Sequence, residues 1–136
     1  MANPATLPAA AIVALLTGQA GLTAGTNLFS TAELAQDAFV PAQAVFVQEY
    51  GGETPQPYFG NSADLRDFSV QILVRGNPED PDGTRTLAWA IWPLLQRASS
   101  SGYIDVRCRN SGPLYLGLDE VARPKYTINL SLRFKG

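Results

Sequence analysis

Apolar and polar residues alternate strictly in three segments of the chain, a period of two that is typical of strands with one buried face. The longest segment covers residues 125–135, where large apolar side chains occupy every second position. The second covers 67–75, in which Leu73 is the one apolar residue on the polar face, and the third covers 104–109. We predict a strand for each segment.

Two shorter segments are also predicted to be extended. Residues 44–50 are rich in β-branched and aromatic side chains and end at Gly51-Gly52, which is typical of a strand that runs into a turn. Residues 114–118 follow Gly112-Pro113 and form a short apolar strand candidate.

Apolar residues recur at helical spacing in two segments. The first covers 7–16, with Thr6 as the predicted N-cap, and Gly18 ends it. The second runs from about 84 to 98, behind an acidic turn. Pro93 lies inside it and forfeits a backbone hydrogen bond, so the helix is expected to kink there or to be shifted by one turn.

The remaining segments, 21–43 and 51–63, are rich in residues that break regular structure. A capping box in the first predicts a short helical turn over 31–37. Loops of this kind often make contacts in an assembly. Tyr58 and Phe59, in the second loop, are therefore candidate interface residues, and whether either loop orders before assembly is left open.

The alternating C-terminal strand needs a cover for its apolar face, and the two amphipathic helices are the available elements. We therefore predict an α+β fold for a single domain of residues 1–136. It consists of one mostly antiparallel β-sheet, with two amphipathic helices packed on one face and polar residues on the other.

Charge is distributed unevenly along the chain. Residues 1–65 carry five acidic and no basic side chains, whereas from Arg66 onward all 10 basic residues stand against 7 acidic ones, and the net charge is −2. Asymmetry of this kind points to a partner or to a self-complementary contact. Charged residues make up only 16% of the chain, which is typical of a surface that other subunits cover.

The chain contains no histidine and a single cysteine, Cys108. This composition excludes a structural zinc site, an internal disulfide and Ser-His-Asp or Cys-His catalysis, so we expect neither an enzyme nor a bound cofactor or metal. Cys108 lies on the apolar register of its strand, which favours a buried, inert thiol over a nucleophile. The acidic turn at 79–83 lacks EF-hand spacing and is interpreted as a solvated turn.

The apolar run at 9–16 resembles the core of a signal peptide. No basic residue precedes it, and it is too short to span a bilayer. We expect a cytosolic chain without a membrane partner, and a cleaved signal is the alternative.

Basic side chains on outward strand positions form the main candidate interface. They are Arg75, Arg107, Arg109, Arg133 and Lys135. If their strands are neighbours, like charges stand side by side, which is unfavourable unless carboxylates, other anions or nucleic acid face them. Alternatively, the strands are staggered or far apart and no such row exists. Specific nucleic-acid binding is not expected, because the aromatic residues alternate into the core and offer no stacking platform.

Both tryptophans lie on the second predicted helix. Leu87, Ile91 and Leu95 already fill its core face, so Trp89 is predicted to point to a flank. A large aromatic side chain on a flank often contacts another subunit or a partner, and core packing is the alternative.

The succession of segments resembles a known family. A strand ending in Tyr50-Gly51-Gly52 precedes an alternating strand ending in Arg75-Gly76-Asn77, and a helix follows. After it come Gly112-Pro113-Leu114 and an alternating terminal strand. This order resembles the minor capsid and tail-terminator proteins of long-tailed bacteriophages and their relatives in phage-like particles, from about residue 41 onward and in the opening helix. The region 22–40 departs from the family in length and composition.

The resemblance implies a virion structural protein without an active site, made in the host cytoplasm and located at the head-proximal end of the tail. It implies a homo-oligomeric ring, a hexamer, that caps the tail tube and meets the head connector or neck protein, with DNA passing through the lumen. A head-closure or neck adaptor, which also forms rings, is the alternative within this class. A nucleic-acid-binding accessory module that uses the arginine face is the alternative from another class.

Overall fold

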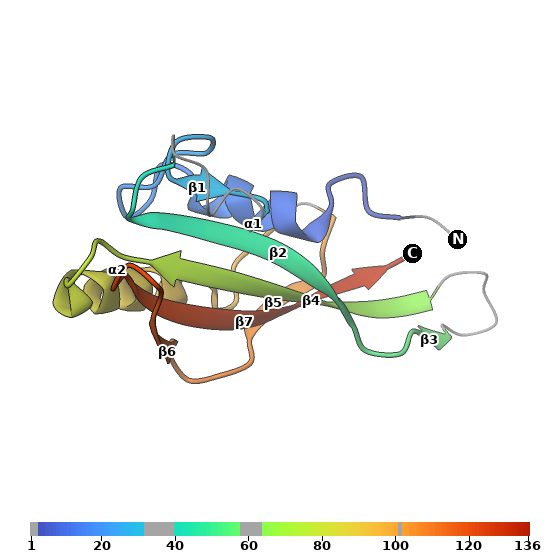
Figure 1. Ribbon diagram of the computed structural model, residues 1–136. Coiled ribbons are helices and arrows are strands. Elements are labelled where there is room, and N and C mark those ends of the chain that lie inside the picture. Colours follow the sequence, from blue (N-terminus) through green and yellow to red (C-terminus); the bar gives the residue numbers. More distant parts are fainter. Residues whose placement is uncertain (1–2, 32–39, 58–63, 101) are drawn as a thin grey trace.

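The computed structural model describes residues 3–31, 40–57, 64–100 and 102–136. Within this part of the chain the elements are α1 (Pro8–Leu16), β1 (Leu28–Phe29), β2 (Ala44–Gly52), β3 (Gln56–Pro57), β4 (Asp64–Arg75), α2 (Pro81–Leu95), β5 (Asp105–Cys108), β6 (Leu114–Leu118) and β7 (Pro124–Lys135). The described strands form one seven-stranded sheet, and both helices lie on the same face of it (Figure 1). The predicted α+β class is confirmed.

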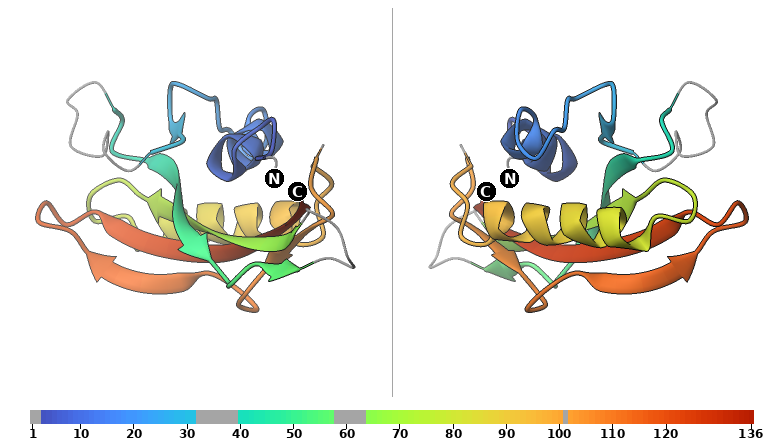
Figure 2. Two further views of the ribbon diagram at one scale, coloured as in Figure 1. Left: turned by 90° about the vertical axis from the view of Figure 1, so that its right-hand side faces the viewer. Right: turned by 90° about the vertical axis from the view of Figure 1, so that its left-hand side faces the viewer.

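The long strands β4 and β7 form the centre of the sheet and pair antiparallel along their whole length. The order is β1-β2-β4-β7-β5, with β3 beside β4 and β6 beside β7, and only β1 pairs in parallel, with β2. Strands β5 and β6 therefore share one side of β7. Figure 2 shows β6 and the start of β7 extending past the helices at one end of the molecule.

The core lies between the helices and the inner face of the sheet. On β7, Leu130 opposes Val70 of β4, and both side chains are fully buried. Ile12 of α1 and Ile91 of α2 are buried against the same cluster. Each such side chain contributes roughly 1.5–3 kcal/mol of transfer free energy, so this layer fixes which face of the sheet is inner.

Both helices begin at a proline. The predicted N-cap, Thr6, is wrong, since the helix starts at Pro8 and Leu7 caps it without a side-chain hydrogen bond. A residue before proline is held in an extended conformation, which excludes Leu7 from the helix. In the same way α2 starts at Pro81, earlier than predicted, with Asp80 as its N-cap.

Helix α2 also ends earlier than predicted, at Leu95, because the chain turns there toward β5. The backbone N–H of Arg97 donates to the carbonyl of Val106 at 2.9 Å. The side-chain oxygen of Gln96 accepts from the backbone N–H of Cys108 at 2.8 Å. Pro93 lies inside the last turn of the helix. The predicted turn over 31–37 lies, apart from Thr31, outside the described residues.

Candidate functional site

The face of the sheet opposite the helices, called here the outer sheet face, carries most of the predicted interface residues. Arg107 of β5 and Arg133 of β7 occupy outward positions, as the alternation predicted, and Arg109 follows directly after β5. Lys135 lies on the same face at the end of β7 and is exposed. The alternative of widely separated strands is therefore wrong for β5 and β7, which pair directly.

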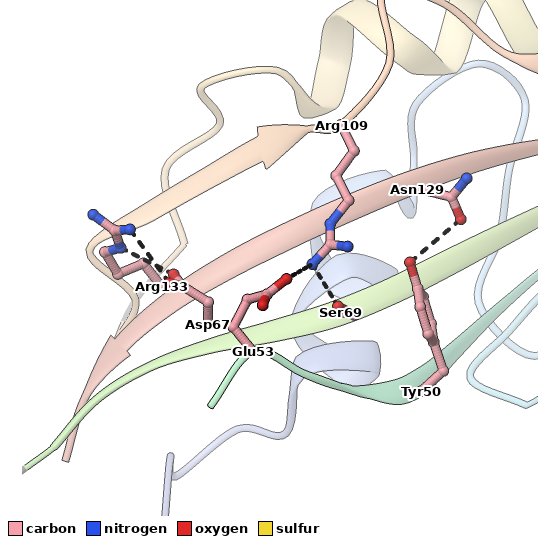
Figure 3. A network of polar contacts seen from close by, with 7 residues as sticks. All are labelled: Tyr50, Glu53, Asp67, Ser69, Arg109, Asn129 and Arg133. Atoms are coloured by element: carbon pink, nitrogen blue, oxygen red, sulfur yellow. Dashed lines mark hydrogen bonds and ion pairs between the residues drawn. The ribbon is translucent and has the colours of Figure 1, made fainter. Parts of the chain in front are cut away.

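Carboxylates stand between these arginines, which is one of the arrangements that the sequence left open for a row of basic side chains. Arg133 donates from Nε to Asp67 Oδ1 at 2.9 Å and from a terminal nitrogen to Oδ2 at 3.3 Å (Figure 3). The hydrogen bond with Asp67 raises the pKa of the Arg133 guanidinium, and the charge of Asp105 adds to this effect. Asp105 also forms an ion pair with Arg107 at 2.9 Å.

Arg109 links the two halves of the chain. Its guanidinium donates to the hydroxyl of Ser69 at 2.6 Å and lies 3.9 Å from a carboxylate oxygen of Glu53 (Figure 3). Glu53 belongs to the acidic N-terminal half, and Arg109 to the basic half. The charge asymmetry of the sequence is thus partly neutralised within one molecule, because strands from both halves interleave in the sheet.

The middle of the outer sheet face is polar but uncharged. Gln48 of β2 donates to Gln71 of β4 at 3.2 Å. The hydroxyl of Tyr50 lies 3.5 Å from the side-chain oxygen of Asn129 on β7 (Figure 3). This face therefore combines an amide-rich centre with ion pairs toward β5.

Arg75 differs from the prediction in its exposure. It lies on the outer register of β4, yet only 2% of its surface is exposed. Its guanidinium donates to the carbonyls of Ala42 at 2.8 Å and Pro41 at 2.9 Å and lies 5.0 Å from the ring centre of Phe46. Burial, together with the charge of Arg123, lowers the pKa of Arg75. In the described structure this side chain fixes the segment before β2 and does not present a surface.

Trp89 lies on the exposed flank of α2, as predicted. It is 50% exposed, and Gly112 lies against its ring so closely that a Cβ there would come within 2.6 Å of it. Trp92, in contrast, packs against the core and donates from its indole nitrogen to the carbonyl of Asn110 at 2.9 Å. An open hollow of about 700 Å³ adjoins Trp89, with Asp82 and other polar side chains of α2 in its lining. The other aromatic candidates, Tyr58 and Phe59, lie outside the described residues.

The sequence prediction missed an exposed apolar edge formed by β6 and the turn after it. The exposed residues are Leu114, Tyr115, Leu116, Leu118 and Val121, each between 43% and 56% exposed. Edge strands normally carry charges that discourage pairing with other chains, and β6 carries none. The sequence does contain a sign of this edge, because residues 114–118 do not alternate between apolar and polar side chains. Whichever side of this strand faces solvent therefore exposes apolar residues.

Asp119 holds the turn between β6 and β7 in one conformation. One of its carboxylate oxygens accepts from the backbone N–H groups of Val121 at 3.0 Å and Arg123 at 2.9 Å, and the other accepts from Nε of Arg123 at 2.6 Å. Desolvation opposes ionisation, but these hydrogen bonds prevail and lower the pKa of the Asp119 carboxyl. The exposed apolar turn is therefore ordered and not a loose loop.

The remaining titratable groups offer little reactivity. Cys108 is partly buried on the inner register, and burial raises its pKa to about 11, so the thiol stays protonated at neutral pH. Burial also raises the pKa of Tyr103 to about 12, and its hydroxyl donates to the carbonyl of Thr6 at 2.6 Å. The described residues include no cluster of metal-ligating side chains. No helix among them is long and apolar enough to cross a membrane.

Comparison with known proteins gives a structural likeness alone. No protein-family model and no curated protein matches the sequence. Among solved structures, a chain in the virion of a native gene transfer agent particle is similar, with a TM-score of 0.52 and 14% sequence identity. The likeness covers 93% of this chain and 86% of that chain. At this identity it shows a shared fold over nearly the whole length of both chains.

Proposed function

We propose that this protein is a structural component of a phage-like virion, and specifically a tail terminator. In this role it forms a ring, a hexamer, that caps the tail tube and joins it to the head connector or neck protein. The observation that carries the proposal is the shared fold with a chain of a gene transfer agent virion over 93% of this chain. The order of segments in the sequence supports the same class independently.

The exposed apolar surface supports assembly. Soluble monomers rarely expose a contiguous apolar patch larger than a few hundred Å², and such patches mark interaction sites. Here four side chains of one short strand and Val121 in the turn beyond it are about half exposed on an ordered edge. Trp89 stands exposed on α2 and rests on Gly112, two residues before that strand.

A role without catalysis is part of the proposal. The sequence contains no histidine, and its only thiol has a raised pKa, so neither a histidine base nor a thiolate nucleophile is available at neutral pH. The charges of the outer sheet face fit a lumen through which DNA passes, and they do not fit a surface that binds DNA tightly. The arginines of this face are engaged by Asp67, Asp105 and Glu53, which leaves little positive charge for phosphates.

The neck adaptor is the second candidate, because it shares ring assembly. Electron microscopy of particles that lack the protein separates the two functions. Loss of a terminator leaves tails that are too long, whereas loss of a neck adaptor leaves tails of normal length that are not attached to heads. Particles of normal length and attachment would contradict both.

A nucleic-acid-binding module is tested by binding to duplex DNA at several salt concentrations. The structural proposal expects no measurable binding at physiological salt. A module that uses the arginine face would instead bind DNA with an affinity that falls steeply as salt rises. Such a result would contradict the structural role.

A further inference from the structure

Two surfaces with exposed apolar side chains lie at opposite ends of the molecule. The first consists of the last residue of β6 and the turn after it, residues 118–121, called here the knob, in which Leu118 and Val121 are each 56% exposed. The second is a hollow of about 480 Å³ beyond the C-terminal end of α2, called here the socket, which Arg97 and Ile104 help to line. Figure 2 shows the β6–β7 turn at one end of the molecule and the segment after α2 at the other, near both termini.

The socket has an apolar rim. Ile104 is 61% exposed and Leu7 is 57% exposed. The hydroxyl of Tyr103, which also lines the socket, donates to the carbonyl of Thr6 and so holds the N-terminal segment beside it. The N-terminal segment, with its exposed Leu7, is thereby tied to a residue that lines the socket.

Each surface also carries one charged side chain that has no partner within the described residues. Within the described residues, Glu120 at the tip of the knob makes no ion pair and no side-chain hydrogen bond. The guanidinium of Arg97 makes no such contact with the described residues either. The aspartate beside each of them is already compensated, because Asp119 pairs with Arg123 and Asp105 with Arg107. The free charges of the two surfaces are therefore opposite in sign.

Arg97 has a backbone conformation that disfavours arginine. It directly follows the C-cap of α2 with φ of 61°, the left-handed region in which glycine is the usual residue. Within the described residues its guanidinium makes no contact that offsets this strain. Strain at a position of this kind is a reason to look for a function outside the chain.

We propose that the knob of one copy inserts into the socket of the next copy. Leu118 and Val121 pack against the apolar rim, and Glu120 pairs with Arg97 of the neighbouring copy. Two different surfaces at opposite ends meet, so the contact is heterologous and repeats head to tail. The proposed ring requires that the rotation between neighbouring copies closes after six of them. The knob is already ordered by Asp119, so little conformational entropy is lost on insertion. This inference rests on the proposed ring and names its subunit contact.

Charge reversal tests the pairing. Glu120→Arg and Arg97→Glu, each alone, are expected to raise the concentration of half-assembly by about tenfold or more, as for close interfacial charge pairs. The double variant is expected to assemble like the wild type. An equimolar mixture of the two single variants is also expected to assemble, because every junction is native or fully reversed in a ring in which the two variants alternate.

Arg97→Gly separates the contact from folding. Glycine relieves the left-handed strain, so the midpoint of thermal unfolding of the monomer is expected to rise while assembly weakens. Assembly is measured by mass photometry over a dilution series. If the wild type forms rings and the single variants also assemble normally, the knob–socket contact is overturned but the ring is not. The same conclusion follows if the single variants dissociate and the double variant does not restore assembly. A monomeric wild-type protein would overturn the ring as well.

Discussion

Asp67 on β4 and Arg133 on β7 are directly opposed in the antiparallel ladder, and their side chains form a forked ion pair. Asp105 on β5 opposes the same arginine from the other side. One arginine thus stands between two aspartates across three neighbouring strands. The charge of Asp105 therefore acts on Arg133 in addition to the backbone pairing of β5 with β7.

We expect Arg133→Ala to lower the free energy of unfolding by about 1–2 kcal/mol, because a bidentate, charge-assisted pair with Asp67 is lost. Urea unfolding followed by circular dichroism measures the change. Arg107→Ala is the control, since Arg107 is more exposed and forms a single contact with Asp105, and we expect a loss of only about 0.5 kcal/mol. Equal losses for the two variants would contradict the special role of the forked pair.

The pKa of Asp119 predicts a pH dependence of stability. Because folding lowers this pKa below its ordinary value of 3.8, the carboxylate stabilises the fold above that value, and the contribution is lost as the pH falls below it. We expect the stability difference between wild type and Asp119→Asn to shrink when unfolding is measured at pH 3 instead of pH 7. A difference that stays constant over this range would show that the carboxylate charge does not hold the turn.

Arg109→Glu is expected to weaken assembly or docking and also to destabilise the monomer. The substitution places a second carboxylate beside Glu53 and removes the bond to Ser69. Arg109→Gln separates the two effects, because it keeps a donor for Ser69 without adding a negative charge. Native mass spectrometry of both variants, with unfolding curves alongside, checks the result. Unchanged oligomers and normal tail joining for Arg109→Glu would remove Arg109 from the interface.

Trp89→Ala is expected to leave the fold intact and to weaken assembly, because half of the side chain is exposed next to β6. The matched change at the other tryptophan of the helix, Trp92→Ala, should instead destabilise the monomer by about 2 kcal/mol or more, because this partly buried ring packs against the core and donates to Asn110. Circular dichroism and mass photometry distinguish the two outcomes. Normal assembly by the Trp89 variant would exclude this flank from the subunit contact.

The fold was predictable because its central strands obey a simple period. The alternation in β4 and β7 fixed which side chains face the helices, and Val70 and Leu130 are buried as expected. The helix boundaries were harder, because the residue that precedes each proline decides where the helix starts. That effect competes with the side-chain capping that Thr6 was expected to provide.

The outer sheet face could be predicted only in part, because ion pairing depends on register. Arg133 was placed correctly, but the opposing Asp67 became visible only once β4 and β7 were aligned. Arg75 was likewise on the predicted face, yet Phe46 and the segment before β2 cover it. No periodicity in a single strand encodes which distant segment will bury a side chain.

The mass of the purified wild-type protein in solution tests the central claim most directly. Native mass spectrometry is expected to show one closed oligomer, at six times the mass of the 14.6 kDa chain, that persists on dilution to low micromolar concentration. A chain that stays monomeric at all concentrations, or that forms an open series of sizes without a closed species, would contradict the ring.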